Sequence, residues 1–198
     1  MAKITTKISR EFRHNRLALF DELNAVQTSK HVAKLYKKIY KIVKAEYAAI
    51  LDYLVEEIAD EAAALGFDGD IRDLDEAWIE EFFDEYNPVT KYVFSNELDR
   101  KKSRLFEALV ASVAEKHKSY QTAENLLMRQ IKQSGIDFED AVARTVFKDA
   151  GVKRVQWNAE NDYKTCSICD ELDGEIFLLA DAPPKAHHNC RCWYTPVG

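Results

Sequence analysis

The chain has 198 residues, of which 46% are apolar, enough to bury a sizeable core in one large domain or two small ones. It has no apolar run of about 18 residues or more that would predict a membrane span, and its start, Met1-Ala-Lys-Ile-Thr-Thr-Lys7, lacks the apolar stretch of a secretory signal. We therefore expect a soluble intracellular protein with no membrane anchor, whose cysteines are kept as thiols.

The net charge of −6 conceals a strong segregation of charge along the chain. Residues 1–44 carry eleven Lys and Arg against three acids, whereas residues 45–87 carry fifteen acids against a single Arg. Residues 88–154 are basic again, and the last 44 residues are mildly acidic. Such blocks are solvated helix faces, or they pair with one another, or they meet complementary surfaces of partners.

Apolar periodicity predicts helices through most of the first 151 residues. A helix is expected over about 5–26, and a second of nearly 40 residues runs from Ser29 to Leu65, with Gly66 placed for a left-handed C-cap. A helix of this length should pack along another long helix or along a partner. A short acidic helix over Leu74–Tyr86, with Asp73 as its N-cap, carries an aromatic stripe that serves core packing or protein docking.

Further helices are expected over about 88–116, 122–133 and 138–150, the last of them closed by Gly151. Strand-like alternation follows over 152–157, 175–179 and 192–195. We therefore expect an α+β fold. An elongated, all-helical body with long amphipathic helices would occupy residues 1–151, and a small β-rich metal-binding module would occupy 152–198.

All four cysteines lie in that module, as Cys166-Ser-Ile-Cys169 and then Cys190-Arg191-Cys192, the latter preceded by His187-His188-Asn189. Two residues between thiols allow a tight turn to aim both sulfurs at one ion, which favours zinc over disulfides in a reducing compartment. Our leading ligand set is Cys166, Cys169, His187 and Cys190. Cys192 is an alternative to either of the last two, because Cys190 and Cys192 share a side if the chain is extended there.

The number of candidate ligands favours a structural zinc over a catalytic one. A hydrolytic zinc keeps three protein ligands, a water and a nearby general base, whereas five sulfur or imidazole candidates fit a closed site. His188 is a weaker sixth candidate. We predict no catalytic residues and no small-molecule substrate, and we expect the zinc to stabilise a module whose core is too small to hold itself.

The order and spacing of these motifs resemble a known family. Trp157, the Cys166-x-x-Cys169 pair, Leu172-Asp173-Gly174 and Phe177, followed by Pro184-x-x-His187-x-Asn189-Cys190-Arg191-Cys192, resemble the C-terminal motif of phage Mu F-like minor head proteins, also called phage head morphogenesis proteins. The likeness covers about the last 45 residues and extends more loosely to the tract 89–102. His188 stands where the family pattern has Pro, and the chain is short for the family.

The resemblance implies a virion protein that takes part in procapsid assembly and head morphogenesis at the portal vertex and is delivered with the DNA. Its partners would be the portal protein and scaffold or capsid proteins, with DNA inside the head as a further candidate. It would reside in the host cytoplasm during assembly and then in the capsid. One alternative is a zinc-stabilised nucleic-acid-binding protein, favoured by the basic segments but opposed by a pI of about 5.5. Another is a zinc-dependent nuclease or hydrolase, for which Glu171, Asp173 and Glu175 are the nearby carboxylates.

Overall fold

The computed structural model describes residues 29–85, 135–185 and 190–198. The helices predicted over 5–26, 88–116 and 122–133 lie outside the described residues. Among the described residues, 50–75, 136–185 and 190–198 belong to one compact unit, and 29–49, 76–85 and 135 belong to another. Within the described ranges, no helix is long and apolar enough to cross a bilayer.

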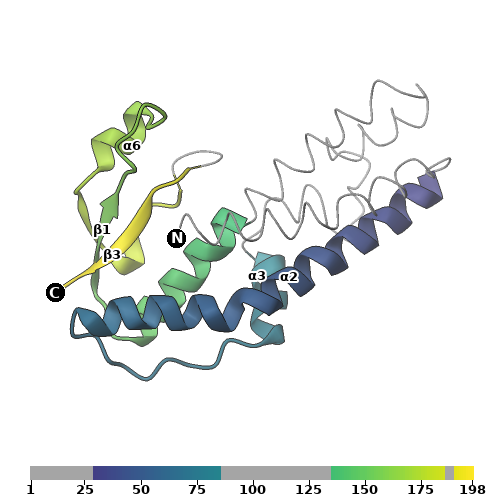
Figure 1. Ribbon diagram of the computed structural model, residues 1–198, viewed down its shortest axis with the longest axis horizontal. Helices are drawn as coiled ribbons and strands as arrows, with labels where there is room; N and C mark the ends of the chain where they lie inside the picture. The colour runs from purple at the N-terminus through teal and green to yellow at the C-terminus, as the bar shows by residue number, and fades with distance from the viewer. Residues whose placement is uncertain (1–28, 86–134, 186–189) are drawn as a thin grey trace. The chain divides into compact units, whose positions relative to one another are not determined.

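The long predicted helix is present as α2, Ser29–Ala64, drawn from purple to blue in Figure 1. Its end is closed as the sequence predicts, because Gly66 adopts a φ of 86°. The Gly66 N–H donates to the Ala63 carbonyl at 2.9 Å, and the Phe67 N–H donates to the Ala62 carbonyl at 3.0 Å. These two bonds form a Schellman motif, which satisfies carbonyls that the helix end leaves without partners.

The acidic aromatic helix is α3, Glu76–Glu85, which begins two residues later than predicted. Asp73 is therefore not its N-cap, and Leu74 is buried in the segment that precedes it. Ile79 and Phe82 are buried, and the Trp78 ring stacks on Phe82 with centroids 6.1 Å apart. The part of the predicted aromatic stripe that contains Ile79 and Phe82 therefore serves core packing.

Lys44 joins α2 to α3 through ion pairs. Its Nζ lies 3.7 Å from a carboxylate oxygen of Glu76 and also pairs with Glu80. Lys44 is the last base of the basic block, and both glutamates belong to the acidic block that follows it. The two charge blocks therefore pair with one another at this point.

A further helix occupies residues 135–149 and is drawn in green in Figure 1. It includes Asp137, which the sequence placed as its N-cap. Its end is again closed by glycine: Gly151 has a φ of 88°, and the Val152 N–H donates to the Phe147 carbonyl at 2.9 Å. Gly151 thus ends the helix as predicted and turns the chain into the sheet.

Three antiparallel strands follow, at the three places where the sequence predicts them: β1 (Arg154–Asn158), β2 (Ile176–Leu178) and β3 (Trp193–Val197). Their order is β2-β1-β3, so β1 is central. Between β1 and β2 stands the short helix α6, Ser167–Leu172, and a 3-10 turn, η3 (Leu179–Asp181), follows β2. Pro196 lies in β3, where an edge strand tolerates a residue without an N–H. The expected α+β class is confirmed by the helices and this small sheet.

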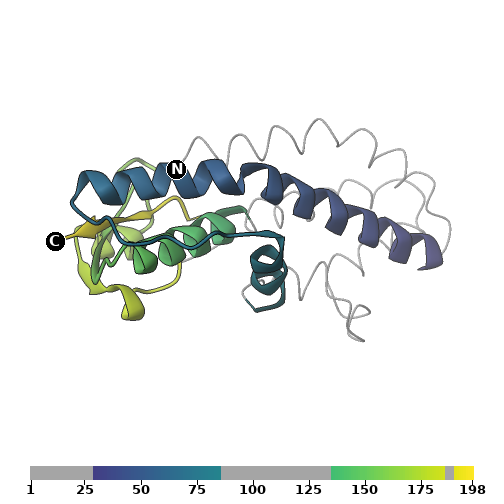
Figure 2. The same ribbon diagram turned by 90° about the horizontal axis from the view of Figure 1, so that it is seen from below.

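The unit that contains the sheet has one continuous apolar interior. Val155, Trp157 and Tyr194 are buried on one face of the sheet, and the Trp157 and Tyr194 rings meet edge to face at 5.3 Å. Figure 2 shows the 135–149 helix beside the sheet and next to the C-terminal half of α2. The buried residues of these two helices recur mostly at steps of three or four: Ile50, Leu51, Leu54, Ile58 and Ala62 in α2, and Phe138, Val142, Val146 and Phe147 in the other.

The segment after α2 lies against the end of the 135–149 helix. The Gly69 N–H donates to the Ala150 carbonyl at 3.3 Å, and Arg72 Nε pairs with Asp149 at 2.9 Å. A Cβ atom on Gly69 would stand 2.3 Å from the Asp149 carbonyl oxygen. Only glycine allows the two backbones to approach this closely.

Candidate metal centre

The register of the sheet determines where the second cysteine pair lies. Asn158, the last residue of β1, pairs with Trp193, the first residue of β3. Cys192 therefore comes directly before β3, at the end of the sheet where β1 leads toward α6. The chain brings the two cysteine motifs to the same end of the sheet, although they are about 20 residues apart.

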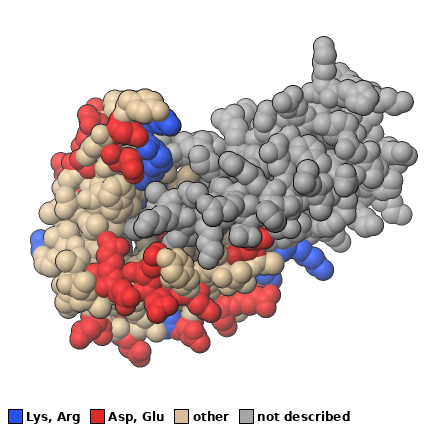
Figure 3. Space-filling model, viewed as in Figure 1, with Lys and Arg blue, Asp and Glu red and all other residues tan. Residues whose placement is uncertain are grey.

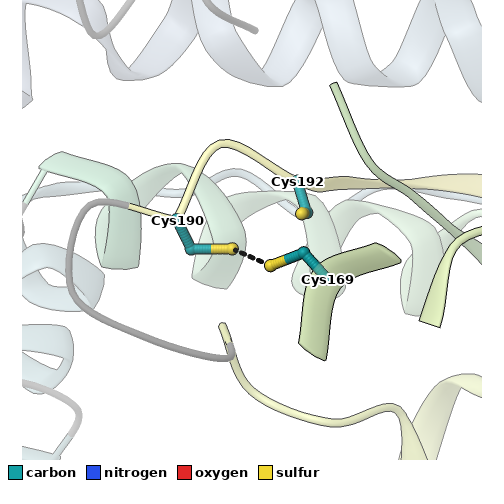
Figure 4. A group of neighbouring side chains, drawn as sticks. All are labelled: Cys169, Cys190 and Cys192. Atoms are coloured by element: carbon teal, nitrogen blue, oxygen red, sulfur yellow. Dashed lines mark hydrogen bonds between the residues drawn. The ribbon is translucent and has the colours of Figure 1, made fainter. Parts of the chain in front are cut away.

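Three of the four cysteines form a compact buried group. The Sγ atoms of Cys169, Cys190 and Cys192 all lie within 4.8 Å of one another, and the Cys169 and Cys190 sulfurs are 3.7 Å apart. Figure 4 shows them pointing toward one another, Cys169 from α6 and the other two from the segment before β3. All three are free thiols, with at most 7% of each residue exposed. The three sulfurs can hold one metal ion.

Cys166 lies beside this group. It is the N-cap of α6, and its Sγ accepts a hydrogen bond from the Cys169 N–H at 3.4 Å. It is half-buried and, among the described residues, does not belong to the three-sulfur group. His187 and His188 lie outside the described residues. The structure thus groups Cys192, our alternative ligand, with Cys169 and Cys190, and the full ligand set stays a prediction.

Cys169 and Cys192 lie in an environment that favours the protonated form of their thiols. Burial, reinforced by hydrogen bonds with the neighbouring cysteines, raises the pKa of Cys169 well above its usual range. Burial likewise raises the pKa of Cys192 to about 11, although Lys185 acts in the opposite direction. A metal ion that binds these sulfurs must therefore displace protons from them.

Arg191 separates the two neighbouring cysteines and points outward. Its guanidinium forms two hydrogen bonds with the carboxylate of Asp162, one of them at 2.8 Å. The Asp162 carboxylate also accepts the Lys164 N–H at 2.9 Å. Mainly because of Arg191, the pKa of Asp162 falls to about 2. This pair holds the segment before β3 against the loop that leads into α6.

The Asp173-Gly174 motif has an architectural role. Asp173 accepts the Ala159 N–H at 2.7 Å and the Asn161 side-chain amide at 2.9 Å, which lowers the pKa of its carboxyl group. Gly174 adopts a φ of 82° and donates its N–H to the Trp157 carbonyl at 2.9 Å. The motif therefore ties the end of α6 to the end of β1.

The sequence analysis missed a buried polar cluster next to the sulfurs, formed by Asp140, Arg144, Lys185 and Tyr194. Arg144 Nε pairs with Asp140 at 2.9 Å, and its guanidinium lies 5.0 Å from the centre of the Tyr194 ring. Lys185 Nζ lies 3.2 Å from Asp140 and donates to the Cys192 carbonyl at 2.6 Å. Burial raises the pKa of the Tyr194 hydroxyl. The i, i+4 spacing of Asp140 and Arg144 indicates a helix pair, but no sequence signal links them to Lys185.

Comparison with known proteins finds similarity in the part of the chain that contains the cysteine motifs. Residues 102–195 match the family model described as Phage Mu protein F like protein. An uncharacterised protein of Haemophilus influenzae is 26% identical over 120 residues, which cover 55% of this chain and 27% of that relative. The chain thus spans about a quarter of the length of this curated relative. No solved structure matches the chain. The resemblance seen in the cysteine motifs is therefore confirmed, since residues 102–195 match the model of the phage Mu protein F like family.

Proposed function

We propose that the protein is a structural component of a phage head that takes part in procapsid assembly, and that its cysteine group is a zinc site with a structural role. The observation that carries this proposal is the buried three-sulfur group, which lies inside the segment that matches the family. In this proposal the metal centre holds the C-terminal sheet together, and the helices contact other head proteins.

The geometry of the sulfurs supports zinc. A Zn–S bond is about 2.3 Å long, so two sulfurs of a tetrahedral site stand roughly 3.8 Å apart. The Cys169 and Cys190 sulfurs are 3.7 Å apart, close to this separation. Buried thiolates are also ligands that zinc prefers. Cys166 or His187 would complete the site with Cys169, Cys190 and Cys192.

The surroundings of the sulfurs support a structural role over a catalytic one. A general base for hydrolysis needs a pKa raised toward neutrality. The pKa of Asp173 is lowered instead, because its carboxylate holds the Ala159 N–H and Asn161. Asp162 is likewise engaged, by Arg191. Asp162 and Asp173, two carboxylates near the sulfur motifs in sequence, thus hold loops in place, which supports our proposal of no enzymatic activity.

The partner surface is proposed on the helices. Figure 3 shows acidic side chains gathered over α2 and the segment that follows it. Asp52, Glu56 and Asp60 are exposed along this part of α2. We propose that this acidic surface contacts a basic surface of the portal protein or of a scaffold or capsid protein. The protein would then act in the host cytoplasm during assembly, remain at the portal vertex of the virion and be delivered with the DNA.

The test is co-purification of the full chain with the portal protein during head assembly. We expect the portal protein to be retained by the wild type and released by raised salt, because the proposed contact is charged. Glu56→Lys combined with Asp60→Lys should weaken retention, whereas Lys153→Met, an exposed change elsewhere, should leave it unchanged. Salt-sensitive retention of DNA without any head protein would favour the nucleic-acid-binding alternative.

A further inference from the structure

The buried cluster beside the sulfurs contains more positive than negative charge. Arg144 and Lys185 share the single carboxylate of Asp140, and only 9% of the Lys185 side chain and 13% of the Asp140 side chain are exposed. A cation removed from water is costly unless an opposite charge or hydrogen bonds compensate it. Among the described residues that form this cluster, one carboxylate therefore faces two cations.

The pairing of Lys185 with Asp140 is also incomplete. Lys185 Nζ lies 3.2 Å from Asp140 Oδ1, yet this oxygen accepts no well-aligned hydrogen bond among the described residues. The hydrogen bond of Lys185 is directed elsewhere, to the carbonyl oxygen of Cys192 at 2.6 Å. Its ammonium also lies 5.3 Å from the centre of the Tyr194 ring and 5.9 Å from that of Trp157. The cation is thus held in a fixed place at the backbone of a sulfur-bearing residue.

A metal held by thiolates would supply the missing negative charge. A divalent ion with three thiolates carries a net charge of −1, and with four thiolates a net charge of −2. Cys192 belongs to the three-sulfur group and is the residue whose carbonyl Lys185 binds. The surplus cation and the expected anionic centre therefore lie next to each other.

We propose that Lys185 is a positioning and charge-compensating residue for the metal centre. By its hydrogen bond it fixes the backbone at Cys192, and by its charge it stabilises the thiolate-bound metal. Through Asp140 it also joins the metal centre to the 135–149 helix. This inference rests on the proposed zinc site and goes beyond it, since Lys185 is not part of any cysteine or histidine motif.

The experiment measures the affinity of the full-length chain for Zn²⁺ by competition with a chromogenic chelator, for four proteins beside the wild type. Lys185→Met removes the charge and keeps most of the stem, and should weaken Zn²⁺ binding by roughly 10- to 100-fold. Lys185→Arg keeps the charge and should recover most of the affinity. Lys153→Met, which removes an exposed lysine before β1, should bind like the wild type.

Asp140→Asn separates an electrostatic role from a merely structural one. This change leaves Arg144 and Lys185 without their shared carboxylate, so the positive charge beside the sulfurs increases. We expect its Zn²⁺ affinity to equal or exceed that of the wild type, even if its denaturation midpoint falls. A merely structural cluster would instead make both Asp140→Asn and Lys185→Met weaker binders.

Each outcome decides one point. If the wild type binds zinc and Lys185→Met binds it equally well, or if Asp140→Asn weakens binding as much as Lys185→Met does, the role of Lys185 is overturned and the zinc site stands. If the wild type does not bind zinc, the proposed metal centre is overturned and this inference with it. The absorption spectrum of the Co²⁺-substituted proteins shows whether the sulfurs still bind the metal in each variant that folds.

Discussion

Arg191 and Asp162 form a two-point ion pair across 29 residues of sequence, at the surface next to the buried sulfurs. Because Arg191 lies between Cys190 and Cys192, its outward direction sets the inward direction of both neighbours. The exposed pair and the buried thiols are thus two sides of one short extended segment. The sequence places Arg191 between the two cysteines, and this ion pair gives a physical reason for that arrangement.

The ion pair predicts a specific dependence of stability on pH. The pKa of Asp162 is about 2 in the folded chain, and that of an aspartate in an unfolded chain is about 3.9. The folded pKa is depressed, so the pair contributes stability above the unfolded pKa, and this contribution is lost as the pH falls through about 2. The exposed position of the pair keeps the contribution small.

The measurement compares urea midpoints of the wild type and Asp162→Asn at several pH values. We expect a constant difference in favour of the wild type between about pH 8 and pH 5, which shrinks below about pH 4. Thr165→Ala is the control, because it removes the hydroxyl that accepts the Asp162 N–H and keeps the Asp162 carboxylate. The difference between its urea midpoint and that of the wild type should therefore stay the same as the pH falls. A difference that grows as the pH falls would contradict this account.

Cys169→Ser should open the sheet and disturb a helix as well. If residues 152–198 formed a separate module, only amides beyond about residue 152 would exchange faster. However, the 135–149 helix contacts this segment, because Arg144 donates to the Ala182 and Pro183 carbonyls. Lys185 also pairs with Asp140 of that helix. We therefore expect faster amide exchange in β1 and β3 and also in the 135–149 helix, with α3 unchanged. Ser167→Ala, an exposed change at the start of α6, should leave exchange as in the wild type. A cooperative loss of protection throughout the chain would contradict a local role of the centre.

The fourth ligand is identified by comparing Cys166→Ser with His187→Ala. Cys166 is already held next to Cys169 by the hydrogen bond at the start of α6. If Cys166 is the ligand, its serine variant should lose part of the sulfur-to-metal charge-transfer absorption of the Co²⁺ protein, and His187→Ala should keep it. If His187 is the ligand, His187→Ala should bind the metal more weakly but keep the sulfur-to-metal absorption, and Cys166→Ser should bind the metal like the wild type.

Gly69→Ala should destabilise the unit that contains the sheet. The added Cβ would meet the Asp149 carbonyl oxygen at 2.3 Å, so one of the two backbones must move and the Gly69 to Ala150 hydrogen bond is strained. Overpacking of this kind costs about 1–3 kcal/mol. Urea denaturation measures the loss, and Asp70→Ala, at an exposed neighbouring position, should change stability by less than about 0.5 kcal/mol. An unchanged midpoint for Gly69→Ala would show that the close approach is absent in solution.

Features that depend on local chemistry could be predicted from the sequence. Gly66 and Gly151 end helices because a left-handed residue is needed there, and the three strands follow from alternating apolar residues. The approach of Cys190 and Cys192 to Cys169 follows from metal-ligand spacing. The division of the chain near Gly151 stays a prediction. The described residues on both sides of Gly151 belong to the same compact unit.

Features that depend on long-range packing could not be predicted. No sequence motif marks Lys185 or Arg144, and their withdrawal from water depends on the docking of the 135–149 helix on the sheet. The need for glycine at Gly69 arises from a backbone 80 residues away. Neither the partner of a buried charge nor the closeness of two distant backbones leaves a periodic signal.

The most direct test of the central claim is the zinc content of the purified full-length chain, prepared under reducing conditions without chelator and measured by elemental analysis. A structural metal centre predicts one zinc ion per chain in the wild type and a ratio near zero in Cys169→Ser, with Ser167→Ala as the matched control that keeps its zinc. A wild-type chain that is folded and contains no zinc would contradict the account.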